Sequence, residues 1–182
     1  ALTMVLDATS VAAADLNTLD GKTSVAINAN TIATMTGSAA DVKTALESAG
    51  ITDDGGVVAT LSAGTTTATV LTDIDAATTG TTDASAITDI SGTAVEVAAV
   101  VAGDITTGNY TSTLSGTSSA ANANTVMNDT AGIVTATVTA TGAVSTLNTA
   151  LGNASATDAL TMVLDATTAS AAELNTLNGK TS

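Results

Sequence analysis

Residues 159–182 read ALTMVLDATTASAAELNTLNGKTS, and they repeat the opening of the chain almost letter for letter. The opening, residues 1–24, reads ALTMVLDATSVAAADLNTLDGKTS. Aligned without a gap, the two stretches differ at five positions, Ser10/Thr168, Val11/Ala169, Ala12/Ser170, Asp15/Glu173 and Asp20/Asn178. The chain therefore returns to its own beginning, which indicates an internal repeat.

The whole chain divides into seven repeats that share one order of features. Each repeat opens with a strand-like run in which apolar residues alternate with others, as at Val134, Ala136 and Val138. A short helical pattern follows, with apolar residues three or four positions apart. The boundaries are 1–24, 25–56, 57–80, 81–109, 110–132, 133–158 and 159–182, so short repeats alternate with longer ones.

Helix ends carry recognisable signals. Ser170 with Glu173, and Thr93 with Glu96, have the spacing of a capping box, and Ser38 before a weaker acidic partner is similar. Glycines follow the helical patterns, where a left-handed C-terminal cap is expected. These glycines are Gly21, Gly50, Gly103, Gly152 and Gly179.

A helix of about two turns is unstable alone, so one repeat can bury its apolar face only against the next. The sequence therefore predicts a single α/β repeat solenoid over residues 1–182. About seven strand–turn–short-helix coils would form a parallel β-sheet with a right-handed path. A doubly wound α/β domain is the alternative, but its helices are longer and its strands more continuously apolar. The positions expected in the stacking core are Leu16, Leu19, Val42, Leu46, Leu71, Ile74, Val97, Val100, Val126, Leu147, Leu151, Leu174 and Leu177.

Composition excludes several classes of partner. The net charge is −14, from 17 acidic residues against three lysines, which opposes binding to nucleic acid or to an anionic membrane surface. Apolar residues make up 45% of the chain, but aromatic residues only 1%. No apolar run approaches the roughly 18 residues of a spanning helix, so no membrane insertion is expected. Burial must come from many small side chains, which fits a thin, elongated core.

Catalytic patterns are missing from the sequence, and we expect that the protein is not an enzyme. The chain has no His for Ser–His–Asp chemistry, no G-x-S-x-G elbow and no glycine-rich phosphate loop. Asp53 and Asp54, followed by two glycines, form a weak candidate for calcium, although an acidic turn explains them better. Asp73 and Asp75 point apart on a helix, so they are expected to be solvated surface. Calcium is the one cofactor left open.

The end motifs resemble a known class of repeat. SAAELNTLNGKTS (170–182) and AAADLNTLDGKTS (12–24) are similar to the xxAELNxLDGxT repeat of very large, low-complexity bacterial proteins, many from marine cyanobacteria, and to segments of phage tail fibres. Residues 23–53 look like the alternate segment of the same proteins. The resemblance implies a secreted, surface-exposed structural array, and it carries over no catalytic residue.

Both ends of the chain are ordinary repeat sequence, without the polar caps that solenoids use. We therefore expect either a continuing array or a head-to-tail homopolymer, in which the chain's partner is itself. Either would belong to a long extracellular fibre, sheath or cell-surface layer. The alternative is a stalk segment of a bacterial adhesin or phage tail fibre, with its binding tip elsewhere.

Overall fold

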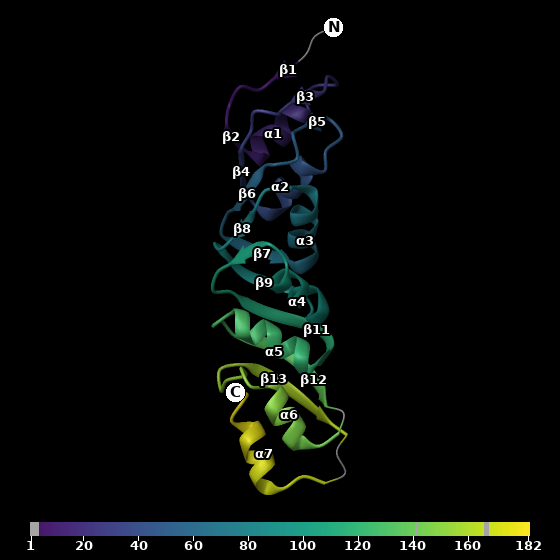
Figure 1. Cartoon of the computed structure of the whole chain (residues 1–182), viewed down its shortest axis with the longest axis vertical. Coiled ribbons are helices and arrows are strands. Elements are labelled where there is room, and N and C mark those ends of the chain that lie inside the picture. The colour runs from purple at the N-terminus through teal and green to yellow at the C-terminus, as the bar shows by residue number, and fades with distance from the viewer. Residues whose placement is uncertain (1–3, 141, 166–167) are drawn as a thin grey trace. The chain divides into compact units, whose positions relative to one another are not determined.

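The computed structural model describes residues 4–140, 142–165 and 168–182. These residues form a mixed α/β structure with seven helices and three parallel sheets, and they contain no closed barrel (Figure 1). The expected α/β class with parallel strands is confirmed. The chain divides into two compact units, one formed by Ala1–Ile87 with Gly103–Gly108 and the other by Thr88–Ala102 with Asn109–Ser182.

The first compact unit contains two of the parallel sheets and three short helices. The smaller sheet has the strand order β1 (Met4–Val5), β3 (Ile27–Asn28), β5 (Ile51–Thr52). The larger sheet has the order β2 (Ser10–Ala12), β4 (Thr34–Gly37), β6 (Val58–Leu61), β8 (Thr82–Ala84), β10 (Ile105–Thr107). The helices are α1 (Ala13–Asp20), α2 (Ala39–Leu46) and α3 (Ala68–Ala77), the last preceded by β7 (Gly64–Thr67). Helix α2 contacts both of the others.

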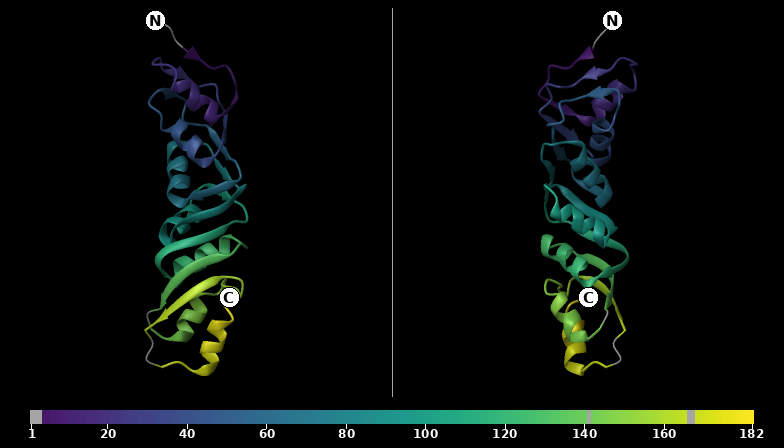
Figure 2. Two further views of the ribbon diagram at one scale, coloured as in Figure 1. Left: turned by 180° about the vertical axis from the view of Figure 1, so that it is seen from behind. Right: turned by 45° about the vertical axis from the view of Figure 1, so that its right-hand side comes forward.

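The second compact unit contains four neighbouring parallel strands and four helices. Its strands are β9 (Ile87–Thr93, from Thr88 onward), β11 (Thr111–Ser119), β12 (Val134–Ala140) and β13 (Ala159–Leu164), in that order. Both views in Figure 2 show β11, β12 and β13 side by side. The helices are α4 (Ala94–Ala102), α5 (Ala120–Asp129), α6 (Val144–Ala150) and α7 (Ala171–Asn178), and each contacts the next.

The strand register advances by a nearly constant step. Ser10 pairs with Thr34, which in turn pairs with Val58, so each step is 24 residues. In the second unit Thr135 pairs with Ala159, again 24 residues on. The sequence boundaries alternate between short and long repeats, whereas hydrogen bonding between strands imposes this even spacing.

One irregularity shortens the step within β11. Ser112 pairs with Val134, but Thr117 pairs with Thr137, so the register shifts between these two pairs. Gly116 lies inside the shifted segment and has a φ of 70°. Glycine adopts this left-handed backbone without strain, as a β-bulge requires.

The expected helix N-termini form as the sequence indicates. Ser170 accepts a hydrogen bond from the Glu173 amide, and the Glu173 carboxylate accepts one from the Ser170 amide, which completes a capping box. Thr93 and Glu96 make the same pair of bonds. Ser38 caps its helix through its side chain alone. These bonds satisfy amides that a helix end leaves without intrahelical partners.

The expected left-handed glycine caps are wrong. None of the five glycines has a positive φ; Gly21 has −65° and Gly179 has −72°. The amide of Gly21 still bonds to the Asn17 carbonyl, and that of Gly179 to the Asn175 carbonyl, so the backbone stays right-handed past each helix. The positive-φ glycines lie in strands and turns instead, at Gly37, Gly55, Gly64, Gly116 and Gly142.

Two other glycines are required by close approach of the backbone. A Cβ added at Gly80 would lie 2.3 Å from the Val57 carbonyl oxygen, and one at Gly132 would lie 2.0 Å from the Tyr110 carbonyl oxygen. In both cases the last residue of a repeat passes directly over the first residue of the same repeat. The chain therefore closes each of these repeats tightly enough to exclude any side chain.

We expect the substitution Gly132→Ala to lower the free energy of unfolding by about 1–3 kcal/mol, because the added methyl group collides with backbone that cannot move independently. Gly152→Ala is the matched control, since its Cβ would approach no atom more closely than 3.6 Å. Urea unfolding of both variants measures the difference. Equal stability of the two variants would contradict the close approach.

Candidate functional site

The calcium candidate is a hydrogen-bonded turn. The Asp53 carboxylate accepts a bond from the Gly55 amide at 2.7 Å, and the Asp54 carboxylate accepts one from the Gly56 amide at 3.1 Å. Within the described residues no group of three or more acidic, His or Cys side chains is placed to hold a metal ion. The two carboxylates stabilise the turn, and calcium binding at Asp53 and Asp54 stays a prediction.

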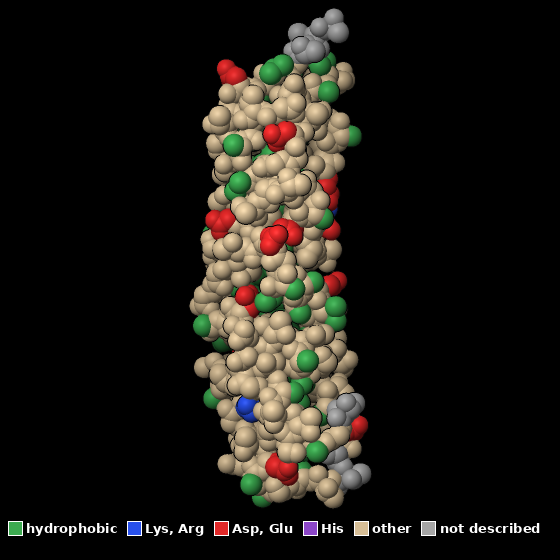
Figure 3. All heavy atoms as spheres, viewed as in Figure 1, with side chains coloured by type: hydrophobic (Ala, Val, Ile, Leu, Met, Phe, Trp, Pro, Cys, Tyr) green, Lys and Arg blue, Asp and Glu red, His purple; other side chains and the backbone are tan. Residues whose placement is uncertain are grey.

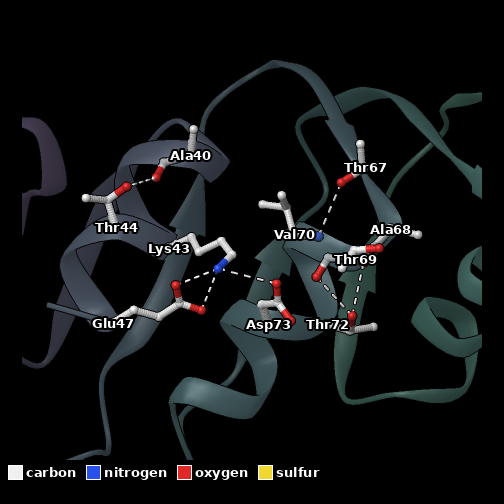
Figure 4. Close-up of polar contacts among 10 residues, drawn as sticks. All are labelled: Ala40, Lys43, Thr44, Glu47, Thr67, Ala68, Thr69, Val70, Thr72 and Asp73. Atoms are coloured by element: carbon white, nitrogen blue, oxygen red, sulfur yellow. Dashed lines mark hydrogen bonds and ion pairs between the residues drawn. The ribbon is translucent and has the colours of Figure 1, made fainter.

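Asp73 takes part in a small charged cluster between two helices. Figure 4 shows the Lys43 side chain extending from α2 between Glu47 on its own helix and Asp73 on α3. The Lys43 ammonium lies 3.3 Å from the Asp73 carboxylate. The hydrogen bond with Glu47 raises the pKa of Lys43 above its ordinary value. All three side chains reach solvent, so the cluster links α2 to α3 but contributes little to stability.

The predicted core residues fall mainly on the buried side of the helices. Those that are buried are Leu16, Val42, Leu71, Ile74, Val97, Val100, Val126, Leu147, Leu151 and Leu177. Leu19 and Leu46 are half-buried. Leu174 is 43% exposed.

One helix position shows a common pattern of burial. The fourth residue of every helix from α1 to α6 is buried, and these residues are Leu16, Val42, Leu71, Val97, Ala123 and Leu147. The fourth residue of α7 is Leu174, which is exposed. A residue in this position is thus covered where a further helix follows α1, α2, α4, α5 or α6 in contact with it.

Threonine hydroxyl groups close two of the repeats. Thr78 donates to the Val57 carbonyl at 2.6 Å and accepts from the Gly80 amide at 3.0 Å. Thr130 donates to the Tyr110 carbonyl and accepts from the Gly132 amide at 3.0 Å. Both belong to a Thr-x-Gly sequence, and both hydroxyls are buried with the backbone groups that they satisfy.

Asparagine side chains link neighbouring helices. The Asn17 amide of α1 donates to the Asp41 carbonyl of α2 at 2.9 Å. The Asn148 amide of α6 donates to the Glu173 carbonyl of α7 at 3.0 Å. In both cases the acceptor is the third residue of the following helix. The repeated Leu-Asn-Thr sequence is the signal for this bond, although sequence reasoning used only its leucine.

The single tyrosine is buried beside a carboxylate. Tyr110 is 1% exposed, and its hydroxyl donates to the Asp129 carboxylate at 2.9 Å. Burial, and then the bond to Asp129, raises the pKa of Tyr110 well above its ordinary value of 10.0. A neutral phenol can donate this hydrogen bond, whereas a phenolate beside the carboxylate would be repelled by it.

The surface charge is dispersed. Figure 3 shows acidic side chains singly or in small groups over the face that it displays, without a basic patch. No helix in the described part of the chain combines the length and the apolar character that a membrane span requires. The main chemical property of the described surface is therefore distributed negative charge.

Comparisons with protein-family models, with curated proteins and with solved structures find no match to this chain. The functional argument consequently depends on the geometry above.

We expect Thr130→Val to destabilise the chain by about 1–3 kcal/mol, because valine keeps the shape but leaves the buried Tyr110 amide without its 3.0 Å partner. Thr149→Val is the control, since the Thr149 hydroxyl is exposed and donates only to a carbonyl in its own helix. Its effect should stay within about 0.5 kcal/mol. Chemical unfolding measures both. A Thr130→Val variant as stable as the control would contradict the closing role of this hydroxyl.

Alkaline pH should weaken the fold through Tyr110. Above the ordinary tyrosine pKa of 10.0, the unfolded chain releases a proton that the folded chain retains, so stability falls as pH rises. Below that pKa the contribution is fully present. Unfolding measured between about pH 8 and 12 tests this, with tyrosinate absorbance as a second signal. Tyr110→Phe should show a shallower decline, and equal declines in the two chains would refute the assignment.

Proposed function

We propose that this chain is a structural repeat protein, an α/β solenoid of about seven strand–turn–helix coils. In this proposal it belongs to a long extracellular fibre, sheath or cell-surface layer and has a mechanical rather than a catalytic role. The extracellular location comes from the resemblance of the end motifs. The solenoid comes from the contacts between neighbouring repeats.

The recurrence of one contact set along the chain carries the proposal. In the first unit, β2, β4 and β6 pair in parallel at 24-residue steps, while α1 contacts α2 and α2 contacts α3. In the second unit, β11, β12 and β13 pair in parallel while α5 contacts α6 and α6 contacts α7. Each repeat thus has the neighbour that a solenoid would provide.

Side-chain bonds at the same spacing strengthen these contacts. Asn17 reaches a carbonyl 24 residues further along, and Asn148 reaches one 25 residues further along. Such bonds connect one repeat with the next and do little within a repeat. A chain built in this way is stabilised by nearest-neighbour interfaces, which is the energetic signature of repeat proteins.

The arrangement suits a load-bearing or spacing role. Parallel strands lie about 4.8 Å apart, so every added coil would lengthen a solenoid by a fixed amount. The high negative charge would keep neighbouring solenoids apart in solution at low salt. A protein with these properties can set a length or a thickness without recognising a small molecule.

A chain with an extra whole repeat tests the solenoid. Inserting a second copy of residues 57–80 directly after Gly80 should preserve the strand register, because the insertion equals one 24-residue step. The melting transition should remain cooperative. The maximum dimension in solution X-ray scattering should grow by about 5 Å per inserted copy, so three copies should give a clear increase.

The matched control inserts only residues 57–68 at the same place. Half a step moves strand residues onto helix positions and should cost the chain its cooperative melting. Equal tolerance of the two insertions would contradict the solenoid. Immunogold electron microscopy of native material would test the cellular role, since labelled unbranched filaments or sheets support it, while label confined to rods with a terminal knob indicates a stalk.

A further inference from the structure

Three helices share the same Leu-Asn-Thr sequence at the same place. It occupies residues 16–18 in α1, residues 147–149 in α6 and residues 174–176 in α7, beginning each time at the fourth helical residue. Helices α1 and α7 are nearly identical, AADLNTLD and AAELNTLN. A contact made by one of these helices is therefore a template for the others.

The α6–α7 junction shows that template in full. The Asn148 side chain donates to the Glu173 carbonyl at 3.0 Å, and the Lys180 ammonium donates to the Leu151 carbonyl at 2.7 Å. Leu147 of α6 and Leu177 of α7 are both buried. The junction thus consists of one asparagine bond, one lysine bond and two covered leucines.

The outer side of α7 presents the α6 half of this junction without an occupant. Leu174, equivalent to Leu147, is 43% exposed, and Leu174 and Leu177 line a surface hollow with Met162. Among the described residues the side-chain amide of Asn175, equivalent to Asn148, has no hydrogen-bond partner. Strand β13 is the end strand of its sheet, so its outer edge is also open.

The outer side of α1 presents the α7 half. Lys22, equivalent to Lys180, is exposed and has no partner among the described side chains and carbonyls. Leu19, equivalent to the buried Leu177, is only half-buried. Strand β1 is the end strand of its own sheet. Each end of the chain therefore shows the half-junction that the other end lacks.

We propose that α7 of one copy docks against α1 of a second copy, repeating the α6–α7 junction between molecules. Asn175 donates to the Asp15 carbonyl of the second copy, and Lys22 of that copy donates to the Asn178 carbonyl of the first. Leu174 and Leu19 become buried at the contact. The contact is heterologous, so its repetition gives an open-ended filament.

A second copy fits this surface because α1 differs from α7 only at Asp15 and Asp20. The first difference leaves the acceptor unchanged, because the bond is made to a backbone carbonyl. The net charge of −14 on each copy opposes association. Assembly should therefore strengthen with added salt, which screens this repulsion. The proposal rests on the repeat architecture proposed above and adds the identity of the partner.

Sedimentation of the full chain over a range of protein and salt concentrations tests the proposal. The wild-type chain should form oligomers whose mass rises with concentration. Leu174→Asp blocks the α7 face, and Lys22→Glu blocks the α1 face. Each variant alone should associate at least about tenfold more weakly, because the contact would enclose a misplaced charge.

Mixing the two variants gives the sharper result. Lys22→Glu retains its α7 face and Leu174→Asp retains its α1 face, so an equimolar mixture should form one-to-one dimers that grow no further. Val95→Asp is the control, since Val95 is 66% exposed on α4 and lies away from both faces in sequence. It should assemble like the wild type. Matching melting temperatures show that all variants are folded.

Three outcomes would overturn the proposal. The first is a wild-type chain that stays monomeric at high salt and high concentration. The second is wild-type assembly without rescue in the mixture, which would place the contact on another surface. The third is a monomeric wild type combined with a higher melting temperature after a copy of residues 25–56 is appended, which assigns the α7 face to a following coil. The insertion of residues 57–80 tests the solenoid separately, so the two failures are distinguishable.

Discussion

The structure depends on burial that no repeat can provide for itself. Most of the helices have seven to nine residues, which is too short for independent stability, and each has one apolar side. Leu71 and Val97 are both fully buried, although each lies on so short a helix. Their burial comes from contacts with neighbouring elements. Strand pairing at a step close to 24 residues then follows, because it brings each helix beside the next.

Close spacing creates a second requirement, for backbone groups as well as side chains. Where Gly80 passes over Val57, the carbonyl and amide groups of the turn lose access to water. The Thr78 hydroxyl satisfies them, and Thr130 does the same above Tyr110. Thr-x-Gly joins both needs in three residues, since glycine permits the approach and threonine supplies the hydrogen bonds. This explains how so many small polar residues can build an ordered chain.

Sequence reasoning succeeded where the cause is local. The capping box at Ser170 and the helical spacing of the leucines depend on residues within one turn, so the printed letters contain the information. It failed where the cause lies about one repeat away. Gly132 looks like a turn residue, but its reason is the carbonyl of Tyr110. The hydrogen bond of Asn17 to Asp41 was missed for the same reason. No spacing rule could show that Tyr110 would lie against Asp129.

The two copies of one sequence show most directly that burial is set by neighbours. Leu16 and Leu174 occupy the same place in nearly identical helices, yet Leu16 is 1% exposed and Leu174 is 43% exposed. Helix α2 contacts α1 on the side where Asn17 bonds, whereas in the described chain no helix follows α7 on the corresponding side. The residue type therefore fixes which surface is apolar, and the next repeat fixes whether that surface is covered. A repeat that is complete in sequence remains incomplete in energy until something contacts its outer face.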